Sequence, residues 1–492
     1  MKKYLIIFLL FSAASIIYLS FPFELKKNFI SIKDNKFNLN SKDFYPLTLN
    51  YIVSMQIDRN GICPCPYIGY NPDTKYLYTT KDSSLMQLKA QMDLIKEMGF
   101  NSVRLVGIGE TRIDEKKAGE LSIVARIENE RDTVIVLSQN DNYIKYFNAL
   151  DELFDVVNKA GLKTIFLTRM SMEYKTTEDH LRRLAAYFKN DTSIMAYDLF
   201  NEPLYFDTPE RNKRDVFKIV KRWNKIQKMY APNQLTTIGL EGIREVFEWD
   251  PNMLDVDFIS YHPYQYEPEQ VRNEIYWYGN FTKKPWIIGE TAIPADGDSV
   301  SYEAQKIFAN KTLKQAYNCG ASGYSWWQYK DVEWQVFHAS FMGVINRKGE
   351  MKTTKENIVV EGTQKPITEE FKKFNPAAKK ESCLCLPNYY NYSQHNKFRL
   401  KGYLADDNND PIEGGVILAW NQYWSHSYHT ITKGDGSFEL LSDYPFYHWM
   451  ASASMYTMVR GDISPDTAKV HTDKIPTINI GKLEIEKLPF ID

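Results

Sequence analysis

Short β-rich runs alternate with amphipathic helical segments from residue 47 to residue 329, and this alternation constrains the fold most. In the helical segments, apolar residues recur at the 3.6-residue period of an α-helix. Such an order predicts parallel strands joined by helical crossovers, and eight units can close into a (β/α)8 barrel. The strands are expected at 47–55, 101–107, 162–168, 193–203, 234–240, 257–264, 284–290 and 323–329. The helices are expected at 84–99, 143–161, 178–190, 214–230 and 302–320.

A doubly wound open sheet is the alternative fold for such an alternation. It is disfavoured because no glycine-rich phosphate-binding loop follows the first strand. One loop, 108–142, is unusually long. It contains the runs LSIVARI and TVIVLSQ around a polar ENERD turn, which predicts a hairpin. A loop that follows a barrel strand lies on the face where active sites form, so this hairpin is expected to wall a cleft.

The chain has 492 residues, more than a barrel of roughly 250 residues needs. We assign 45–375 to the barrel domain, with a closing helix at 367–375, and 376–395 to a linker. Past the linker, short strand-like runs are separated by the turns DNNDPIEG and KGDG. Residues 396–487 are therefore expected to form a small all-β sandwich.

The N-terminus has the character of a targeting segment. Lys2 and Lys3 precede an uncharged stretch from Tyr4 to Phe23. Residues 1–23 are either a cleaved signal peptide or a retained membrane anchor, and both alternatives export the chain. The formal net charge is −2 and no basic stripe is present, so nucleic acid is not expected as a partner.

Four of the five cysteines form two Cys-x-Cys pairs, Cys63 with Cys65 and Cys383 with Cys385. We expect disulfides that join the 63–65 loop to the 383–385 linker, as suits an oxidising compartment. A four-thiolate zinc site is the alternative. The fifth cysteine, Cys319, is expected to be a buried thiol at the end of a helix.

Two glutamates close apolar runs that are expected to be barrel strands. Glu202 ends the fourth strand after IMAYDLFN, and Glu290 ends the seventh after PWIIG. A charged side chain rarely closes a buried strand without a purpose, although a lone one can cap a helix or pair with an arginine. Together they would meet at the mouth of the barrel. Two carboxyl groups, one protonated and one ionised, are the pair that cleaves glycosidic bonds.

Polar residues on neighbouring strands strengthen this interpretation. His262 and Tyr264 alternate on the sixth strand and so share a face, although a lone histidine there would more often be a satisfied core residue. Tyr264 can donate a hydrogen bond to Glu290 and hold it ionised. Arg104 is a cation inside the apolar second strand, and Glu290 is its candidate partner.

Two further residues are candidates for substrate binding. Asn201 precedes Glu202 and can present its amide to a sugar hydroxyl. Trp327 on the eighth strand offers a flat apolar face for a sugar ring, whereas Trp326 points the other way and is expected to be packing.

The motifs LFNEP (199–203), SYHPY (260–264), IIGE (287–290) and WWQYKD (326–331) resemble the signature of clan A glycoside hydrolases, most of all the cellulase-type family 5. The resemblance covers about residues 45–350. It implies that Glu202 is the acid/base and Glu290 the nucleophile. It also implies that Arg104 corresponds to the arginine of the family's second strand. Trp327 and Asp331 keep the spacing of a family tryptophan and aspartate, of which the tryptophan lines the sugar site. The chain departs from the family after the third strand, where Thr168-Arg169-Met170 replaces a sugar-binding histidine, so a glucan specificity does not carry over.

The C-terminal region resembles the carboxypeptidase regulatory-like sandwich through KGYLADDNNDPIEGGVILAW and TKGDGSFEL. A scaffold or spacer role is favoured for it. Binding of glycan through Trp420, Tyr423, Trp424 and Tyr428 is the alternative.

The sequence thus predicts an exported, retaining β-glycoside hydrolase that needs no metal and no cofactor. Its partner would be a carbohydrate, with possible membrane attachment through the N-terminus. A catalytically silent sugar-binding barrel with a tethering sandwich is the second hypothesis. A transglycosylase would use the same residues, and the glycan, its linkage and the oligomeric state stay open.

Overall fold

The computed structural model describes residues 28–59, 61–70, 80–108, 112–114, 119–127, 131–207, 209–264, 268–334, 336–355, 357–384, 397–470 and 473–489. The predicted targeting segment 1–23 and Cys385 lie outside these residues. Within the described ranges, no helix combines the length and apolar character needed to cross a bilayer.

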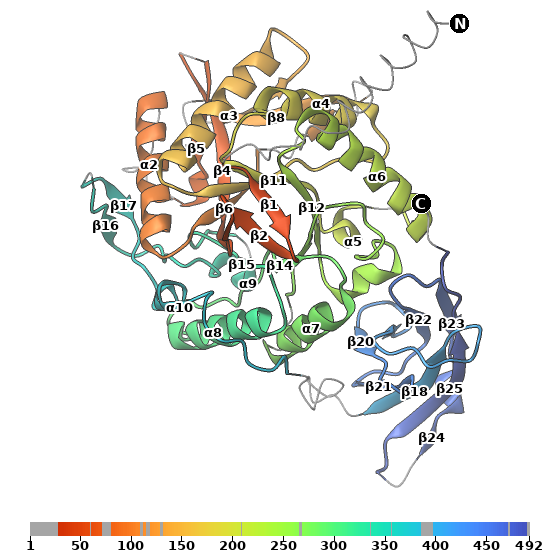
Figure 1. Ribbon diagram of the computed structural model, residues 1–492. Helices are drawn as coiled ribbons and strands as arrows, with labels where there is room; N and C mark the ends of the chain where they lie inside the picture. The colour runs from red at the N-terminus through yellow and green to blue at the C-terminus, as the bar shows by residue number, and fades with distance from the viewer. Residues whose placement is uncertain are drawn as a thin grey trace, which may run out of the picture.

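Eight parallel strands form a closed barrel, as the alternation predicted (Figure 1). Closure is made by the last strand, which pairs with the first through Tyr324 opposite Leu47. A doubly wound sheet would leave two edges, so the open alternative is wrong. In chain order the strands are β4 (Leu47–Asp58), β6 (Ser102–Val106), β10 (Lys163–Leu167), β11 (Ile194–Asn201), β12 (Leu235–Leu240), β13 (Ile259–Tyr261), β14 (Trp286–Ile288) and β15 (Gly323–Trp326).

Long helices surround the barrel, and their apolar stripes face it. In α6, for example, Val216, Val220 and Trp223 are buried at helical spacing while the opposite face is charged. The long helices are α2 (Lys81–Glu97), α3 (Asn142–Lys159), α4 (Lys175–Phe188), α6 (Lys213–Tyr230), α7 (Pro268–Phe281) and α8 (Tyr302–Asn318). Helix α7 had no counterpart among the predicted helices. It buries polar Asn273 and Glu274 as well as Ile275 and Trp277, because it is covered on two sides, and this blurs its apolar period.

The sandwich takes the place of one barrel helix. Between β12 and β13 the described chain has only the short 3-10 helix η4 (Ile243–Phe247). The sheet with strand order β20-β19-β22-β23 packs there, and Val416, Leu418 and Ile431 join the core cluster of the barrel (Figure 1). Its strands are β19 (Val416–Trp420), β20 (Ser427–Ile431), β22 (His448–Ser452) and β23 (Met458–Asp462).

A second sheet completes the predicted all-β sandwich and encloses a small core of its own, which contains Leu400 and Phe438. Its strands, in the order β21-β18-β25-β24, are β21 (Ser437–Ser442), β18 (Phe398–Ala405), β25 (Pro476–Glu484) and β24 (Lys469–Val470), and η6 (Pro465–Thr467) precedes β24.

Buried polar contacts fix the sandwich to the barrel. The Lys213 ammonium on α6 donates to Asp250 Oδ2 at 3.0 Å and to Ser452 Oγ at 2.9 Å. On the other side, Trp277 Nε1 donates to the Gly414 carbonyl oxygen at 2.8 Å. A buried charge without its partner is strongly unfavourable, so these contacts make the two parts one packing unit.

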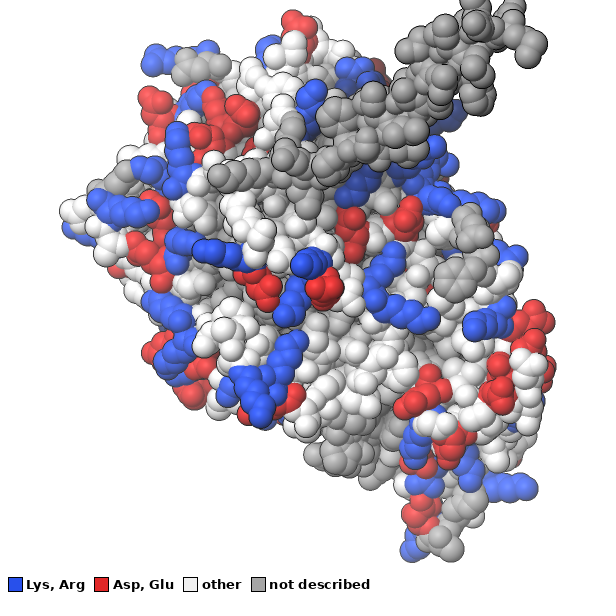
Figure 2. All heavy atoms as spheres, viewed as in Figure 1, with Lys and Arg blue, Asp and Glu red and all other residues white. Residues whose placement is uncertain are grey.

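A small meander closes the N-terminal end of the barrel. It consists of β1 (Ile30–Lys33), β2 (Lys36–Leu39) and β3 (Lys42–Asp43), and it buries Phe37 against Phe258 at the start of β13. Figure 1 views the barrel from this end, with β1 and β2 in front. On the same face, Figure 2 shows basic and acidic side chains interspersed rather than gathered by sign.

The first barrel strand continues past the barrel and carries a second small sheet. β5 (Gly61–Pro66) pairs antiparallel with β4. β8 (Glu120–Ile127) pairs parallel with the C-terminal end of β4. β8 and β9 (Arg131–Val136) form the predicted hairpin, with β7 (Arg112–Asp114) on the other edge of β8.

The remaining elements are η1 (Ile68–Tyr70), α5 (Pro203–Phe206), α9 (Phe337–Ser340), β16 (Glu350–Lys352), β17 (Val359–Glu361) and α10 (Thr368–Lys373), the last of which is the predicted closing helix.

The predicted cysteine pairing is wrong. Cys383 is bonded to Cys319, at the end of α8, so Cys319 is not a free thiol. Cys63 and Cys65 are both unpaired thiols, each 1% exposed. The reason is positional, since β5 packs against α2 and α3, whereas Cys383 lies at the end of α8. A four-thiolate zinc site is ruled out as well, because the sulfur of Cys383 is already committed.

Candidate active site

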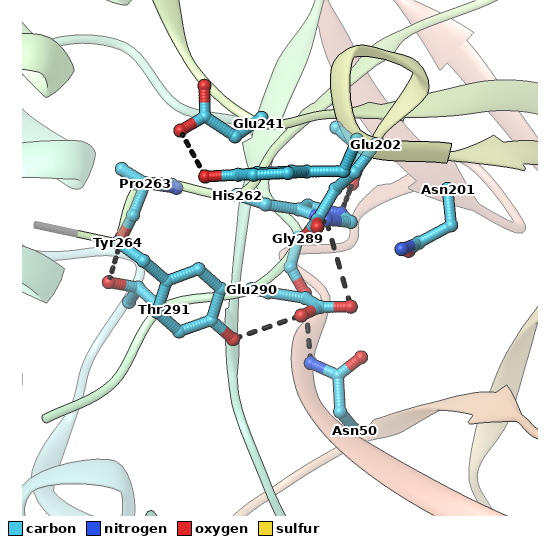
Figure 3. A network of polar contacts seen from close by, with 12 residues as sticks. Asn50, Asn201, Glu202, Glu241, His262, Pro263, Tyr264, Gly289, Glu290 and Thr291 are labelled. Carbon is cyan, nitrogen blue, oxygen red and sulfur yellow. Dashed lines mark hydrogen bonds and ion pairs between the residues drawn. The ribbon is translucent and has the colours of Figure 1, made fainter. Parts of the chain in front are cut away.

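The two glutamates singled out in the sequence meet at the end of the barrel where the parallel strands terminate (Figure 3). Glu202 directly follows β11, and Glu290 lies two residues past β14. One carboxylate oxygen of each lies within 4.8 Å of the other. Their side chains are 15% and 7% exposed, so both border solvent without being immersed in it.

The backbone at Glu202 aims its side chain into the barrel mouth. Its φ is 45° and its ψ is 67°, a left-handed conformation that residues other than glycine seldom adopt. The Glu202 amide donates to the Gly239 carbonyl oxygen at 2.8 Å, and Pro203 opens α5 at its first position. Strain held in this way by neighbouring contacts is typical of residues with a functional position.

Arg104 organises the floor of the site. Its guanidinium is fully buried and donates to Asp198 Oδ2 at 2.8 Å, to Asn50 Oδ1 at 3.1 Å and to Asn201 Oδ1 at 2.7 Å. A further donor bonds to Glu290 Oε1. Four acceptors from β4, β11 and the end of β14 therefore fix one cation, and this orients the Glu290 carboxylate.

The contacts of Glu290 favour its ionised form against the cost of burial. Burial raises the pKa of Glu290 above the usual value for a glutamate. The positive charge of Arg104 and the hydroxyl of Tyr264 act in the opposite direction. Tyr264 Oη donates to Glu290 Oε2 at 3.0 Å, the contact expected from the sequence (Figure 3). Burial alone would lower the pKa of Arg104. The negative charges of Asp198 and Glu290 outweigh this effect, so the pKa of Arg104 is raised.

His262 bridges the two glutamates as a neutral ring. Its Nδ1 lies 3.0 Å from Glu202 Oε1 and 3.7 Å from Glu290 Oε1. Burial lowers the pKa of His262 to about 4, so the imidazole is uncharged near neutral pH. On its other side, Nε2 lies 3.4 Å from Ser260 Oγ. A neutral ring between the carboxyl groups can relay a hydrogen bond without adding a charge.

Two glycines make room for His262. A Cβ atom at Gly239 would lie 2.4 Å from the ring, and one at Gly289 would lie 1.8 Å from Ser260 Oγ and 2.8 Å from His262 Nε2. These glycines belong to the chain segments of the fifth and seventh strands, which flank the sixth. Any side chain at either position would displace the histidine from Glu202.

Trp326 has the packing role that the sequence predicted. Trp326 is fully buried and packs against Phe308 and Phe371 on the helices, so it is packing. Trp327, one residue past β15, is partly buried against the core cluster of the barrel, and its amide donates to the Thr291 carbonyl oxygen at 3.1 Å, next to Glu290. Asp331, four residues after Trp327, forms a buried ion pair with Lys365 Nζ at 2.8 Å, which gives it a structural role. Burial raises the pKa of Asp331 to about 6.

Arg169 occupies the position where the family resemblance implied a histidine. It has a φ of 45°, and its guanidinium lies 5.0 Å from the ring centre of Phe206 on α5. The rim beside Glu202 thus carries a cation stacked on an aromatic ring. Tyr205 and Phe206 are 62% and 48% exposed there.

Glu202, His262 and Glu290 also form the one cluster of potential metal ligands found among the described residues. Its donors are two carboxylates and one imidazole, a set that divalent cations accept. However, the Arg104 guanidinium already bonds to Glu290, and a second cation beside it would be repelled. The residues therefore fit an organic substrate better than an ion.

Sequence reasoning missed two members of the site, Asp198 and Asn50. Asp198 is fully buried within β11, and Asn50 lies opposite Arg104 in the register of β4 and β6. Asn50 Nδ2 also donates to the Gly289 carbonyl oxygen at 2.9 Å, which steadies the turn before Glu290. A signal was available, since an acid and an amide inside apolar strands are as unusual as the arginine.

No known family description matches the chain, and no curated protein sequence matches it. It is similar to a glycoside hydrolase family 5 mannosidase from Rhizomucor miehei, with 14% identity and a TM-score of 0.44 over 70% of this chain and 96% of that one. GH5_18 from Streptomyces cattleya, in complex with GlcNAc, has 13% identity and a TM-score of 0.45 over 74% and 84%.

A second group of similar structures belongs to glycoside hydrolase family 2. The GH2 β-galacturonidase from Eisenbergiella tayi has 14% identity and a TM-score of 0.45. The match covers 70% of this chain but only 55% of that one, so the chain corresponds to about half of the larger enzyme.

Proposed function

We propose that this protein is a retaining β-glycoside hydrolase, with Glu202 as acid/base and Glu290 as nucleophile. The observation that carries the proposal is the separation of the two carboxylates, whose nearest oxygens lie within 4.8 Å. Retaining enzymes place their carboxyl groups about 5–5.5 Å apart, whereas inverting enzymes leave about 6.5–9.5 Å for a water molecule. The separation favours direct attack by a carboxylate.

Charge balance assigns the roles. Three carboxyl groups, those of Asp198, Glu202 and Glu290, surround the single guanidinium of Arg104 and a neutral imidazole. Arg104 bonds to Asp198 and Glu290, which makes these two the natural anions. A third negative charge beside Glu290 would be repelled, so Glu202 holds the proton at the start of the reaction. The group with the proton is the acid, and the anion is the nucleophile.

The proposed reaction has two steps. Glu290 attacks the anomeric carbon while Glu202 gives its proton to the departing glycosidic oxygen, which forms an ester between the sugar and Glu290. Glu202, now ionised, takes a proton from water as that water attacks the same carbon. The ester bond breaks, Glu290 is again a carboxylate, and the sugar leaves with its original configuration. Neither step requires a metal or a cofactor.

We further propose that the chain is exported and acts on a β-linked oligo- or polysaccharide. The basic residues and apolar stretch of segment 1–23 support export, and so does the Cys319–Cys383 disulfide, since such bonds persist in oxidising compartments. Asn201 beside Glu202, and Trp327 directly after the eighth strand, are the proposed sugar contacts.

Azide rescue tests the two roles separately. In Glu202→Ala the sugar still forms an ester with Glu290. Azide should then attack the anomeric carbon from the opposite face, displace the Glu290 carboxylate and yield a β-glycosyl azide. In Glu290→Ala azide should displace the leaving group itself and yield an α-glycosyl azide. Nuclear magnetic resonance of products from an activated aryl β-glycoside distinguishes the two anomers.

The same assay separates the rival hypotheses. A silent sugar-binding barrel would release no aglycone from any aryl glycoside, and the two variants would bind sugar like the parent chain. A transglycosylase would form the same azides but would transfer the sugar to added acceptor sugars rather than to water. An exchanged pattern of anomers would mean that the roles of Glu202 and Glu290 are reversed.

A further inference from the structure

The turn between β19 and β20 exposes an aromatic cluster that the proposed chemistry does not use. Tyr423 and Trp424 are 80% and 53% exposed. The Trp424 ring lies 4.0 Å from that of Trp420, centre to centre, with a tilt of 43° between the planes. Trp420 also stacks on His448 at 5.5 Å. We propose that this cluster is a second carbohydrate site, which holds a β-linked polysaccharide chain outside the catalytic cleft.

The turn is built to present these rings. Trp424 has a φ of 57°, a left-handed conformation that is uncommon for a bulky residue. The conformation is held by hydrogen bonds within the turn, from Trp424 N to the Asn421 carbonyl oxygen at 3.1 Å and from Asn421 Nδ2 to Ser425 Oγ at 2.8 Å. A turn of this kind could relax with glycine or asparagine in place of Trp424. Instead it keeps a large indole at a strained position facing solvent.

The turn points toward the catalytic face of the barrel. The chain just before β19 contacts the C-terminal half of α7 through Gly414 and Trp277. Further along the sheet, His429 on β20 contacts Glu274 and Gln270, nearer the start of α7. The hairpin therefore extends toward the N-terminal end of α7. A barrel helix begins on the face where the strands end, and this is the face with Glu202 and Glu290.

Chemistry selects a sugar chain as the occupant. Indole and phenol rings offer flat apolar faces to the CH groups of a pyranose, and the polar Asn421, Ser425 and His426 alongside can bond to its hydroxyls. Trp420 packs between Trp424 and His448 and so supports the exposed Trp424 ring, which together with Tyr423 offers the surface for a sugar. The proposal rests on the proposed function for its substrate class, and it adds that the substrate is longer than the catalytic cleft. Of the four aromatic residues named from the sequence, Tyr428 is buried at 9% exposure and takes no part.

Affinity electrophoresis of the full chain tests the site. Native gels would contain soluble β-1,4-mannan, hydroxyethyl cellulose or arabinoxylan, and the protein would carry Glu290→Gln so that it binds without hydrolysis. At least one polymer should retard this parent. Adding Tyr423→Ala and Trp424→Ala should weaken the affinity for that polymer about tenfold, which corresponds to about 1.4 kcal/mol. Trp424→Phe should retain most of the affinity.

Two controls make the outcome decisive. Tyr187→Ala removes a half-exposed tyrosine on α4 and should leave retardation unchanged. With Glu290 intact, the Tyr423→Ala/Trp424→Ala chain should hydrolyse a short aryl glycoside at the parental rate, and this separates the distant site from the cleft. Equal retardation of parent and double variant, or no retardation of the parent by any of the three polymers, overturns the proposal. Loss of retardation in a protein that hydrolyses no aryl glycoside would uphold the site and refute the proposed function.

Discussion

Arg104 and Asp198 form a fully buried ion pair, with Nε donating to Oδ2 at 2.8 Å. The same guanidinium bonds to Glu290, so Asp198 competes with the proposed nucleophile for one positive charge. Asp198 is therefore a positioning residue. Its negative charge affects the ionisation of Glu290 through Arg104, and Asp198 itself does not contact the substrate.

Replacing Asp198 with Asn should therefore alter the pH profile as well as the rate. With one anion fewer, Arg104 stabilises ionised Glu290 more strongly, so the acid limb of the kcat/KM profile should move to lower pH. We expect kcat to fall about tenfold, which is about 1.4 kcal/mol, because the guanidinium loses one of its anchors. Steady-state kinetics on an aryl glycoside from pH 4 to 8 measures both effects. An unmoved acid limb would mean that Asp198 has only a structural role.

Gly289→Ala should inactivate the enzyme by moving His262. The added Cβ would lie 1.8 Å from Ser260 Oγ and 2.8 Å from His262 Nε2, so the ring must shift from Glu202. Overpacking of this kind costs about 1–3 kcal/mol of stability, and a misplaced acid should cost about 100-fold in kcat. Gly434→Ala is the matched control, since its nearest neighbour would lie 3.9 Å away. Aryl-glycoside kinetics and thermal unfolding of both variants test this, and a fully active Gly289→Ala enzyme would contradict it.

Acid should destabilise the fold through buried histidines. Burial lowers the pKa of both His180 and His262 to about 4, below the usual value of about 6.5. Between these pH values the unfolded chain takes up protons that the folded chain does not, so stability falls as pH drops from about 6.5 to about 4. Each histidine can contribute about 3 kcal/mol. His180, whose ring nitrogens have no hydrogen-bond partner among the described residues, provides the test. In urea titrations at pH 7 and pH 4.5, His180→Phe should lose less stability than the parent, and equal losses would contradict this.

Barrel and sandwich should unfold together. Leu418 of β19 belongs to the core cluster of the barrel and is 5% exposed. Leu418→Ala should cost about 2–5 kcal/mol, and the loss should appear in one cooperative transition that contains the whole protein. Leu400→Ala, in the separate core of the sandwich, is the comparison. Calorimetry that resolved two transitions, with only the smaller one shifted by either change, would show that the sandwich is an independent module.

The disulfide should stabilise the connection between the two parts. It joins Cys319 to Cys383 across 64 residues, and closing a loop of that length in the unfolded chain is worth about 2–4 kcal/mol. Cys319→Ser with Cys383→Ser should lower the free energy of unfolding by this amount. Peptide mapping without reduction should find the 319–383 link, and Cys63 and Cys65 should react with alkylating agents only after unfolding. A link from either of them to the linker would contradict the structure.

The sequence by itself determined the barrel, the sandwich and the pair of glutamates. Periodicity is a local property, so the 2-residue and 3.6-residue patterns identify strands and helices without knowledge of their neighbours. Strand ends follow from the same patterns, and parallel strands end at one face, so Glu202 and Glu290 could be placed together from their positions alone. Arg104 was visible for a related reason, as a charge within an apolar run.

Only the tertiary structure decided what depends on distance between remote segments. Helix α7 lost its clear period because the sandwich covers a second side of it. The cysteines paired by proximity rather than by motif, since β5 is enclosed by helices while α8 ends beside the linker. Asp198 joined Arg104 because closure of the barrel brings their strands into one interior. Which acid an arginine meets, which thiol a cysteine reaches and which helix a sandwich replaces are set by packing in three dimensions, and local patterns do not encode that packing.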